Sequence, residues 1–204
     1  MLIKLLLIAV FICTSIPSLL IANDTLYVNV DKSRIHWTGK KVTGEHSGTV
    51  DISSSFIVME RDSIIGGEFI IDMSTIKNTD IESPEWQRKL ELHLMNEDFF
   101  YVDSFPFVIL NIKNHQFIQS EESEKIDQIF AELTIRGITH AIQFPFQLSQ
   151  QNSIFFAEGF FDINRTLFNI QYNSGTFFEN LGDRMIYDDF TIQFSLQTKE
   201  IIGK

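Results

Sequence analysis

Histidine, cysteine and acidic side chains are the residues of this sequence that could bind a metal ion. Its histidines stand far apart, and no H-x-H or H-x3-H pair would place two of them on one face of a strand or helix. The single cysteine lies in an apolar N-terminal stretch, away from all of them. We therefore predict no metal site. The histidines are His36, His46, His93, His115 and His140.

Patterns typical of catalysis are equally sparse. Ser174 lacks the G-x-S-x-G sequence of a nucleophile elbow, and no phosphate-binding loop is present. Asp188 and Asp189 are adjacent, but a glycosidase pair is defined by spatial separation, which the sequence does not show. We predict a binding protein that is not an enzyme and needs no cofactor. An enzyme that uses an internal cavity as its active site is the alternative.

The composition excludes some partners. The formal net charge of −11 disfavours nucleic acid, because phosphate recognition needs a basic face, and it disfavours adsorption to anionic lipid by charge alone. Hydrophobic residues make up 44% of the chain, which is enough for a sizeable core. With 20 Phe against 4 Tyr and 2 Trp, the aromatic residues are mostly apolar throughout. This surplus fits either a packed core or an apolar cavity.

Residues 1–22 resemble a secretory signal peptide. Lys4 supplies the positive charge, Leu5 to Ile12 the apolar region, and Leu20 to Ala22 a cleavage site. An uncleaved membrane anchor is the alternative, because the apolar stretch is almost long enough to span a bilayer. We predict cleavage near Ala22 and a periplasmic or otherwise exported protein without a membrane span, whose single domain covers residues 23–204. The processed chain has no cysteine and forms no disulfide.

The rest of the chain alternates apolar and polar residues, which predicts β-strands with one buried face. The clearest alternation covers residues 35–38, 67–73, 129–135, 142–148 and 190–196. Turn-forming residues such as Arg136-Gly137 separate these runs. We predict an all-β, antiparallel fold. Closure into a barrel of about eight strands would leave no free edge, and a two-sheet sandwich is the main alternative.

One segment predicts a short helix inserted between the strands. Ser83 fits the N-cap, Pro84 the first helical position, and Glu85 the first turn. Trp86 and Leu94 lie on one face at helical spacing. Trp86 would either anchor this helix to the barrel or cover an opening of the barrel, and the sequence does not separate these two roles.

Four segments, in order, resemble motifs of the YceI-like family. Phe69–Ile76 is similar to F-x-V-D-M-S-S-I, and His93–Phe100 with Pro106 is similar to H-L-x-S-x-D-F-F…Y-P. Leu133–Thr139 is similar to L-T-I-R-G-V-T, and Ile163–Ile170 resembles I-D-R-T-D-F-G-I more weakly. The resemblance spans roughly residues 25–199. It implies an extended lipocalin-like barrel, usually periplasmic, with a tunnel for a polyisoprenoid such as a quinone or a prenyl phosphate.

The fourth segment departs from the family pattern. Asn164 and Leu167 stand where acidic residues are usual, and Asn169 replaces a glycine. These changes put the shape of that turn in doubt.

The resemblance implies that inward-facing apolar side chains line the tunnel, whereas a filled core is the ordinary alternative for a β protein. The predicted tunnel residues are Trp37, Phe69, Ile71, Met73, Leu133, Ile135, Phe144, Phe146, Phe155, Phe161, Ile192 and Phe194.

Four further residues are candidates for the tunnel mouth or for a ligand headgroup: Trp86, His93, Arg136 and Arg165. Arginine suits a phosphate, although either arginine could instead bind turn carbonyls. The expected function is to hold or carry a long isoprenoid or similar lipid. The alternative is a ligand-free barrel that acts as a stress-related protein-interaction module, and a homodimer is compatible with the sequence.

Overall fold

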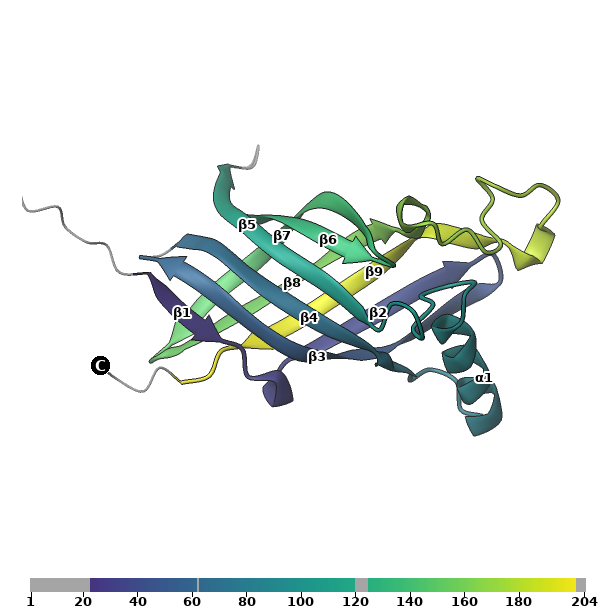
Figure 1. Ribbon diagram of the computed structural model, residues 1–204, viewed down its shortest axis with the longest axis horizontal. Coiled ribbons are helices and arrows are strands. Elements are labelled where there is room, and N and C mark those ends of the chain that lie inside the picture. Colours follow the sequence, from purple (N-terminus) through teal and green to yellow (C-terminus); the bar gives the residue numbers. More distant parts are fainter. Residues whose placement is uncertain (1–22, 62, 120–124, 201–204) are drawn as a thin grey trace, which may run out of the picture.

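The computed structural model describes residues 23–61, 63–119 and 125–200. The predicted signal peptide lies outside the described residues. Those residues form the following elements, shown in Figure 1: β1 Asp24–Tyr27, η1 Val30–Lys32, β2 Arg34–Lys41, β3 Gly44–Glu60, β4 Ser63–Asn78, α1 Pro84–Met95, β5 Phe107–Gln119, β6 Lys125–Ile135, β7 Ile138–Gln151, β8 Ile154–Asn164, η2 Arg165–Phe168, η3 Gly182–Arg184 and β9 Ile186–Gln197. Within these ranges, no helix has the length and apolar character to span a bilayer.

Strands β2 to β9 form a closed antiparallel barrel. The sheet order is β1-β3-β2-β9-β8-β7-β6-β5-β4, and pairing of β3 with β4 closes it. The short β1 pairs with the second half of β3, while β2 pairs with the first half. Closure leaves the barrel strands with no unpaired edge. The predicted all-β barrel with an inserted helix is confirmed, and the sandwich alternative is wrong.

The two ends of the barrel differ (Figure 1). One end carries α1, the β2–β3 hairpin and the segment 169–185, and we call it the helix end. The opposite end carries β1 and the C-terminal part of the described chain. The polar features described below all lie at the helix end.

Period-2 alternation turns one face of each strand inward. In β4, Phe69, Ile71 and Met73 are buried, whereas Ser74 is exposed. The hairpin between β6 and β7 turns through Arg136 and Gly137, which both have positive φ. Two consecutive positive φ values define a turn whose twist matches that of the flanking strands.

Helix α1 is attached to the end of β4 by side chains from both of its halves, and the Gln87 amide donates to the Asn78 carbonyl oxygen at 2.6 Å. Ser83 and Pro84 occupy the N-cap and first helical positions, as the sequence predicts. Leu94 is buried in the core cluster. Buried Glu91 accepts a hydrogen bond from the Asn78 backbone N–H at 3.1 Å and pairs with Lys77 at 3.4 Å. These contacts join α1 to the end of β4 and keep the Leu94 side chain in the core at the helix end of the barrel.

A second polar cluster fixes the connection between β4 and α1. The Asp80 carboxylate accepts a hydrogen bond from the Ser47 backbone N–H at 2.8 Å and contacts His46 Nδ1 at 2.9 Å. It also accepts a hydrogen bond from the Asn78 side-chain amide. Partial burial by itself would raise the pKa of Asp80, but the hydrogen bonds from Ser47, His46 and Asn78 together lower it.

We expect the Asp80→Asn variant to be less stable than the wild type near pH 6, by less than about 1 kcal/mol because the pair is partly exposed. Since the folded-state pKa of Asp80 is lowered, its stabilising effect is present above the unfolded-state pKa of about 3.9 and is lost as the pH falls through the folded-state value. Urea unfolding between pH 6 and about pH 2.5 should show the difference shrinking. An Asp103→Asn control, at an exposed carboxylate, should show no such trend. A pH-independent difference would contradict the assignment.

Candidate ligand-binding cavity

The barrel encloses a cavity of about 200 Å³ lined almost entirely by apolar side chains. Every barrel strand contributes, and α1 adds Leu94 at one end. One lining residue from each strand, in chain order, is Trp37, Val50, Phe69, Leu110, Leu133, Phe144, Phe161 and Phe194. Such a lining offers a water molecule almost no hydrogen-bond partners, whereas a buried water needs two or more.

The cavity is long and therefore slender. Both Ile64 near the start of β4 and Ile76 near its end contribute to the lining. At roughly 3.3 Å per residue, these two positions are about 40 Å apart along the strand. A volume of about 200 Å³ spread over most of this length suits a single extended chain better than a compact molecule.

The structure places almost all of the predicted tunnel residues around this cavity. The exception is Phe155, which lies at a separate pocket of about 10 Å³ together with Leu148 and Leu196. Phe155 is near the start of β8, where the barrel closes beyond the end of the main cavity. The residues that line the main cavity are Trp37, Phe69, Ile71, Met73, Leu133, Ile135, Phe144, Phe146, Phe161, Ile192 and Phe194.

Three aromatic rings pack together in the cavity wall. Phe144 stacks on Phe161 with ring centroids 4.3 Å apart and an interplanar angle of 12°. Phe194 meets Phe144 edge to face at 5.8 Å. Gly159 leaves room for this ring, because a Cβ there would lie 2.7 Å from the end of Phe194. The rings thus form an aromatic wall from three consecutive strands of the sheet.

Residues with charged or hydroxyl-bearing side chains join the lining at the helix end, where they present apolar atoms to the cavity. Arg165, Tyr187 and Asp189 join its lining there, together with Gly39 on the neighbouring strand. Tyr187 and Asp189 are also exposed to solvent. This is therefore the part of the lining where the cavity approaches the surface.

A β-bulge shapes this part of the wall. Gly39 pairs with Phe190 and Lys41 pairs with Ile186, so a single residue of β2 faces the three residues 187–189 of β9. Tyr187 and Asp189 lie in this bulge, and both are exposed and also contact the cavity. Gly39 has the same facing as Trp37, and a Cβ added there would meet no atom within 4 Å. The cavity is therefore open in front of Gly39.

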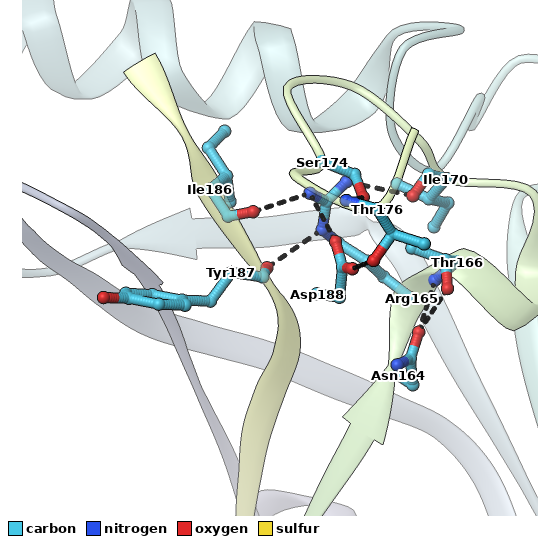
Figure 2. A network of polar contacts seen from close by, with 9 residues as sticks. All are labelled: Asn164, Arg165, Thr166, Ile170, Ser174, Thr176, Ile186, Tyr187 and Asp188. Atoms are coloured by element: carbon cyan, nitrogen blue, oxygen red, sulfur yellow. Dashed lines mark hydrogen bonds and ion pairs between the residues drawn. The ribbon is translucent and has the colours of Figure 1, made fainter. Parts of the chain in front are cut away.

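Arg165 fills the space beside the bulge with a network of hydrogen bonds (Figure 2). The residue is only 4% exposed. Its guanidinium donates to the carbonyl oxygens of Tyr187 at 3.1 Å, Ile170 at 2.9 Å and Ile186 at 3.1 Å. It also pairs with the Asp188 carboxylate at 3.4 Å. Burial lowers the pKa of Arg165 and the charge of Asp188 raises it again in part, but an arginine stays protonated in either case.

The same network holds the loop that follows η2. Thr176 Oγ1 donates to Asp188 at 2.6 Å, and the Thr176 N–H donates to Ser174 Oγ at 3.2 Å (Figure 2). Ser174 is fully buried and acts as a loop anchor. In the altered turn, Asn164 caps η2 and Asn169 adopts the left-handed conformation that glycine would favour.

The other three mouth candidates do not line the cavity. Trp86 is 58% exposed, with the Lys89 ammonium 4.5 Å from the centre of its ring. His93 Nε2 contacts Asp98 at 3.3 Å, and its ring packs edge to face on Phe99 and Tyr172. Arg136 donates to the carbonyl oxygens of Phe99 and Asn169, both at 3.0 Å.

Arg136 therefore connects two loops at the helix end. This is the role at turn carbonyls that the sequence offered as the alternative to binding a headgroup. Of the four candidates, Arg165 alone lines the main cavity described here.

Sequence reasoning missed Gly39, Tyr187 and Asp189. Gly39 follows Trp37 at period 2 and was detectable in principle, but the bulge that contains Tyr187 and Asp189 depends on strand register. Within the described residues, no three His, Cys, Asp or Glu side chains gather in a geometry that could hold a metal ion.

A closed eight-stranded antiparallel barrel around a slender apolar cavity defines this chain as a lipocalin-like barrel protein. The YceI-like domain family matches residues 27–198, and the chain belongs to this family. No curated protein matches the chain.

Two similar solved structures share the fold over most of this chain. BcnA of Burkholderia cenocepacia is 16% identical and superimposes with a TM-score of 0.67, covering 84% of this chain and 99% of its own. A polyisoprenoid-binding domain from Saccharophagus degradans, implicated in plant cell wall breakdown, is 11% identical with a TM-score of 0.62, covering 86% of this chain and 98% of its own.

A third similar structure is the YceI protein of Campylobacter jejuni. It is 15% identical with a TM-score of 0.53, covering 80% of this chain and 85% of its own. At these identities the likeness establishes the fold.

Proposed function

We propose that this protein binds a long, slender apolar lipid of the isoprenoid type inside the barrel and carries or stores it, without catalysing a reaction on it. The observation that supports this proposal most directly is the apolar cavity that extends along most of β4. Family membership and the polyisoprenoid-binding domain that shares the fold support the isoprenoid class of the ligand. A predicted signal peptide supports export as the setting of this function.

The free energy of the empty cavity supports the same proposal. At roughly 24 cal/mol per Å³, a void of about 200 Å³ costs on the order of 5 kcal/mol of stability. That is comparable with the whole net stability of many domains, so a filled barrel would be the more stable solution. A ligand that fills the void would recover much of this loss.

The binding energy would come mainly from burial. Each CH2 group transferred from water contributes about 0.8 kcal/mol, so a prenyl chain can bind tightly with few polar contacts. An engineered cavity of about 150 Å³ holds a benzene molecule, and the present volume therefore accommodates only part of a long prenyl chain. A longer chain would need side chains of the lining to move outward.

The helix end of the cavity suggests where a headgroup would lie. Tyr187 and Asp189 contact both the cavity and the surface, whereas the hydrogen-bonding capacity of Arg165 is largely used by the protein. A neutral or hydroxyl-bearing headgroup suits this arrangement better than a phosphate, because the exposed carboxylate of Asp189 would repel an anion.

Native mass spectrometry of the protein purified from a bacterial host, followed by organic extraction, tests the proposal. We expect a stoichiometric adduct that extracts as an isoprenoid quinone or a polyprenyl lipid. At a ligand concentration of 100 times Kd, binding should stabilise the fold by about 2.7 kcal/mol, which corresponds to a rise in Tm of roughly 5–10 °C. An apo mass and a Tm that stay unchanged after incubation with such lipids would instead favour the ligand-free interaction module.

A further inference from the structure

Apolar side chains are exposed around the end of the barrel where the cavity approaches the surface. Phe177 and Phe178, in the loop between Ser174 and η3, are 47% and 50% exposed. Tyr187 is half-exposed and also lines the cavity. Val42 at the tip of the β2–β3 hairpin is exposed as well, and its N–H donates to the Met185 carbonyl at the end of the same loop. We call Val42, Phe177, Phe178 and Tyr187 the rim.

The rim is built into the fold rather than being part of a loose loop. The N–H groups of Phe177 and Phe178 both donate to the Ser174 carbonyl, at 3.2 and 3.0 Å. Ser174 is fully buried, and Thr176 is tied through Asp188 to Arg165. The buried network of Figure 2 thus holds two aromatic rings out into solvent beside the helix end of the cavity. Such an arrangement costs free energy unless the rings contact an apolar partner.

We propose that this end of the barrel docks on a lipid bilayer, with the rim inserted into the interface, so that a lipid passes directly between the membrane and the cavity at the helix end, past Gly39. The inference rests on the proposed function, because a long isoprenoid is too apolar to cross water unaided at about 0.8 kcal/mol per CH2. Its carrier must take it from a membrane. A bilayer is the partner that brings the ligand to the rim.

The chemistry of the helix end fits a bilayer interface. Phe and Tyr rings insert at the boundary between headgroups and acyl chains, where an amphipathic ring such as tyrosine is enriched. Three basic residues of the helix end, Lys40, Lys41 and Arg184, could contact lipid phosphates. Glu45, Glu179 and Asp183 lie in the same segments and offset their charge. This near balance of charge predicts docking through apolar contact, with similar binding to neutral and to anionic vesicles.

The decisive variant is Phe177→Ser/Phe178→Ser, compared with Phe160→Ser. Phe160 is 67% exposed on β8, in register with Gln193 in the middle of the barrel wall, and provides a matched loss of an exposed ring away from the rim. Binding of the whole purified chain is measured by co-sedimentation with vesicles of phosphatidylcholine, alone or mixed with phosphatidylglycerol. These vesicles contain no isoprenoid.

We expect the wild type and Phe160→Ser to bind both kinds of vesicle, and the double variant to bind at least about tenfold more weakly. Inserting the two half-exposed rings into the bilayer would bury about as much apolar surface as burying one whole phenylalanine side chain, which accounts for the expected loss of affinity. Equal binding of the double variant and the wild type would overturn the proposal. So would failure of the wild type to bind either kind of vesicle.

A second measurement separates this proposal from the proposed function. Uptake of a polyprenol is followed from detergent micelles and from vesicles. The double variant should take up the lipid from micelles as the wild type does, and lose uptake only from vesicles. If no variant takes up the lipid from micelles, the proposed function fails, while binding to isoprenoid-free vesicles still decides whether the rim docks.

Discussion

Replacing Arg165 with methionine is expected to lower the free energy of unfolding by about 3–5 kcal/mol, the cost of breaking a buried ion pair by removing one partner. The side chain is 4% exposed, and its hydrogen bonds satisfy the carbonyls of Ile170, Ile186 and Tyr187. Methionine has a similar length but no donor. The variant therefore leaves these acceptors and the charge of Asp188 without their partner.

Urea unfolding followed by fluorescence measures this loss, and Arg136→Met is the matched control. Arg136 also bonds two carbonyl oxygens, but it lies nearer the surface, where water can replace the lost donor. We expect the control to lose about 1 kcal/mol, as for one ordinary hydrogen bond. The argument would be wrong if the two variants lost the same stability. Because arginine stays protonated, the deficit of Arg165→Met should be constant from pH 6 to pH 8 (about the physiological range).

Arg165 and Arg136 also show what the sequence could not resolve. Both arginines lie directly after the end of a strand, Arg136 after β6 and Arg165 after β8, so either could have faced the ligand. What distinguishes them is burial, which depends on the bulge in β9 and on the segment 169–185 folding back over η2. Neither feature has a local sequence period. The choice of headgroup residue therefore needed tertiary structure, whereas the barrel itself did not.

The barrel and most of its lining were predictable because alternation is a local signal. Once a strand has one buried face, the parity of each residue decides whether it points inward, which places Phe69, Ile71 and Met73 together. Parity does not say where along the strand the cavity ends. Phe155 has the inward parity of Phe161, but it lies beyond that end and meets the small second pocket instead.

Helical periodicity was informative in the same limited way. It placed Trp86 and Leu94 on one face, and Leu94 does line the cavity. Trp86, two turns earlier, is more than half exposed, although its neighbour Gln87 donates a hydrogen bond to the Asn78 carbonyl oxygen at the end of β4. Helical periodicity identifies the face of a helix that can pack. How many turns of that face are buried depends on the surface of the barrel beneath them.

Replacing Gly39 with tryptophan is expected to slow both the uptake and the release of the ligand by at least about tenfold, a barrier of about 1.4 kcal/mol or more. Gly39 lines the cavity opposite the bulge, its φ is not in the left-handed region, and an added Cβ would meet no atom within 4 Å. The indole ring therefore has room to extend into the cavity near its helix end, where it would narrow the passage that a lipid is expected to take. Thermal stability should change by no more than about 0.5 kcal/mol.

The matched control is Thr38→Trp, which adds the same ring to the neighbouring position of β2, on the opposite face of the strand. Stopped-flow fluorescence with a polyprenol that carries a fluorescent group gives both rate constants. A blocked passage slows both rates equally and leaves Kd unchanged, because it raises a barrier that is common to both directions. A ring that instead occupied ligand space would raise Kd and leave the uptake rate almost unaffected. Unchanged rates in Gly39→Trp would mean that the lipid enters elsewhere, and the opposite end of the barrel would become the place to block next.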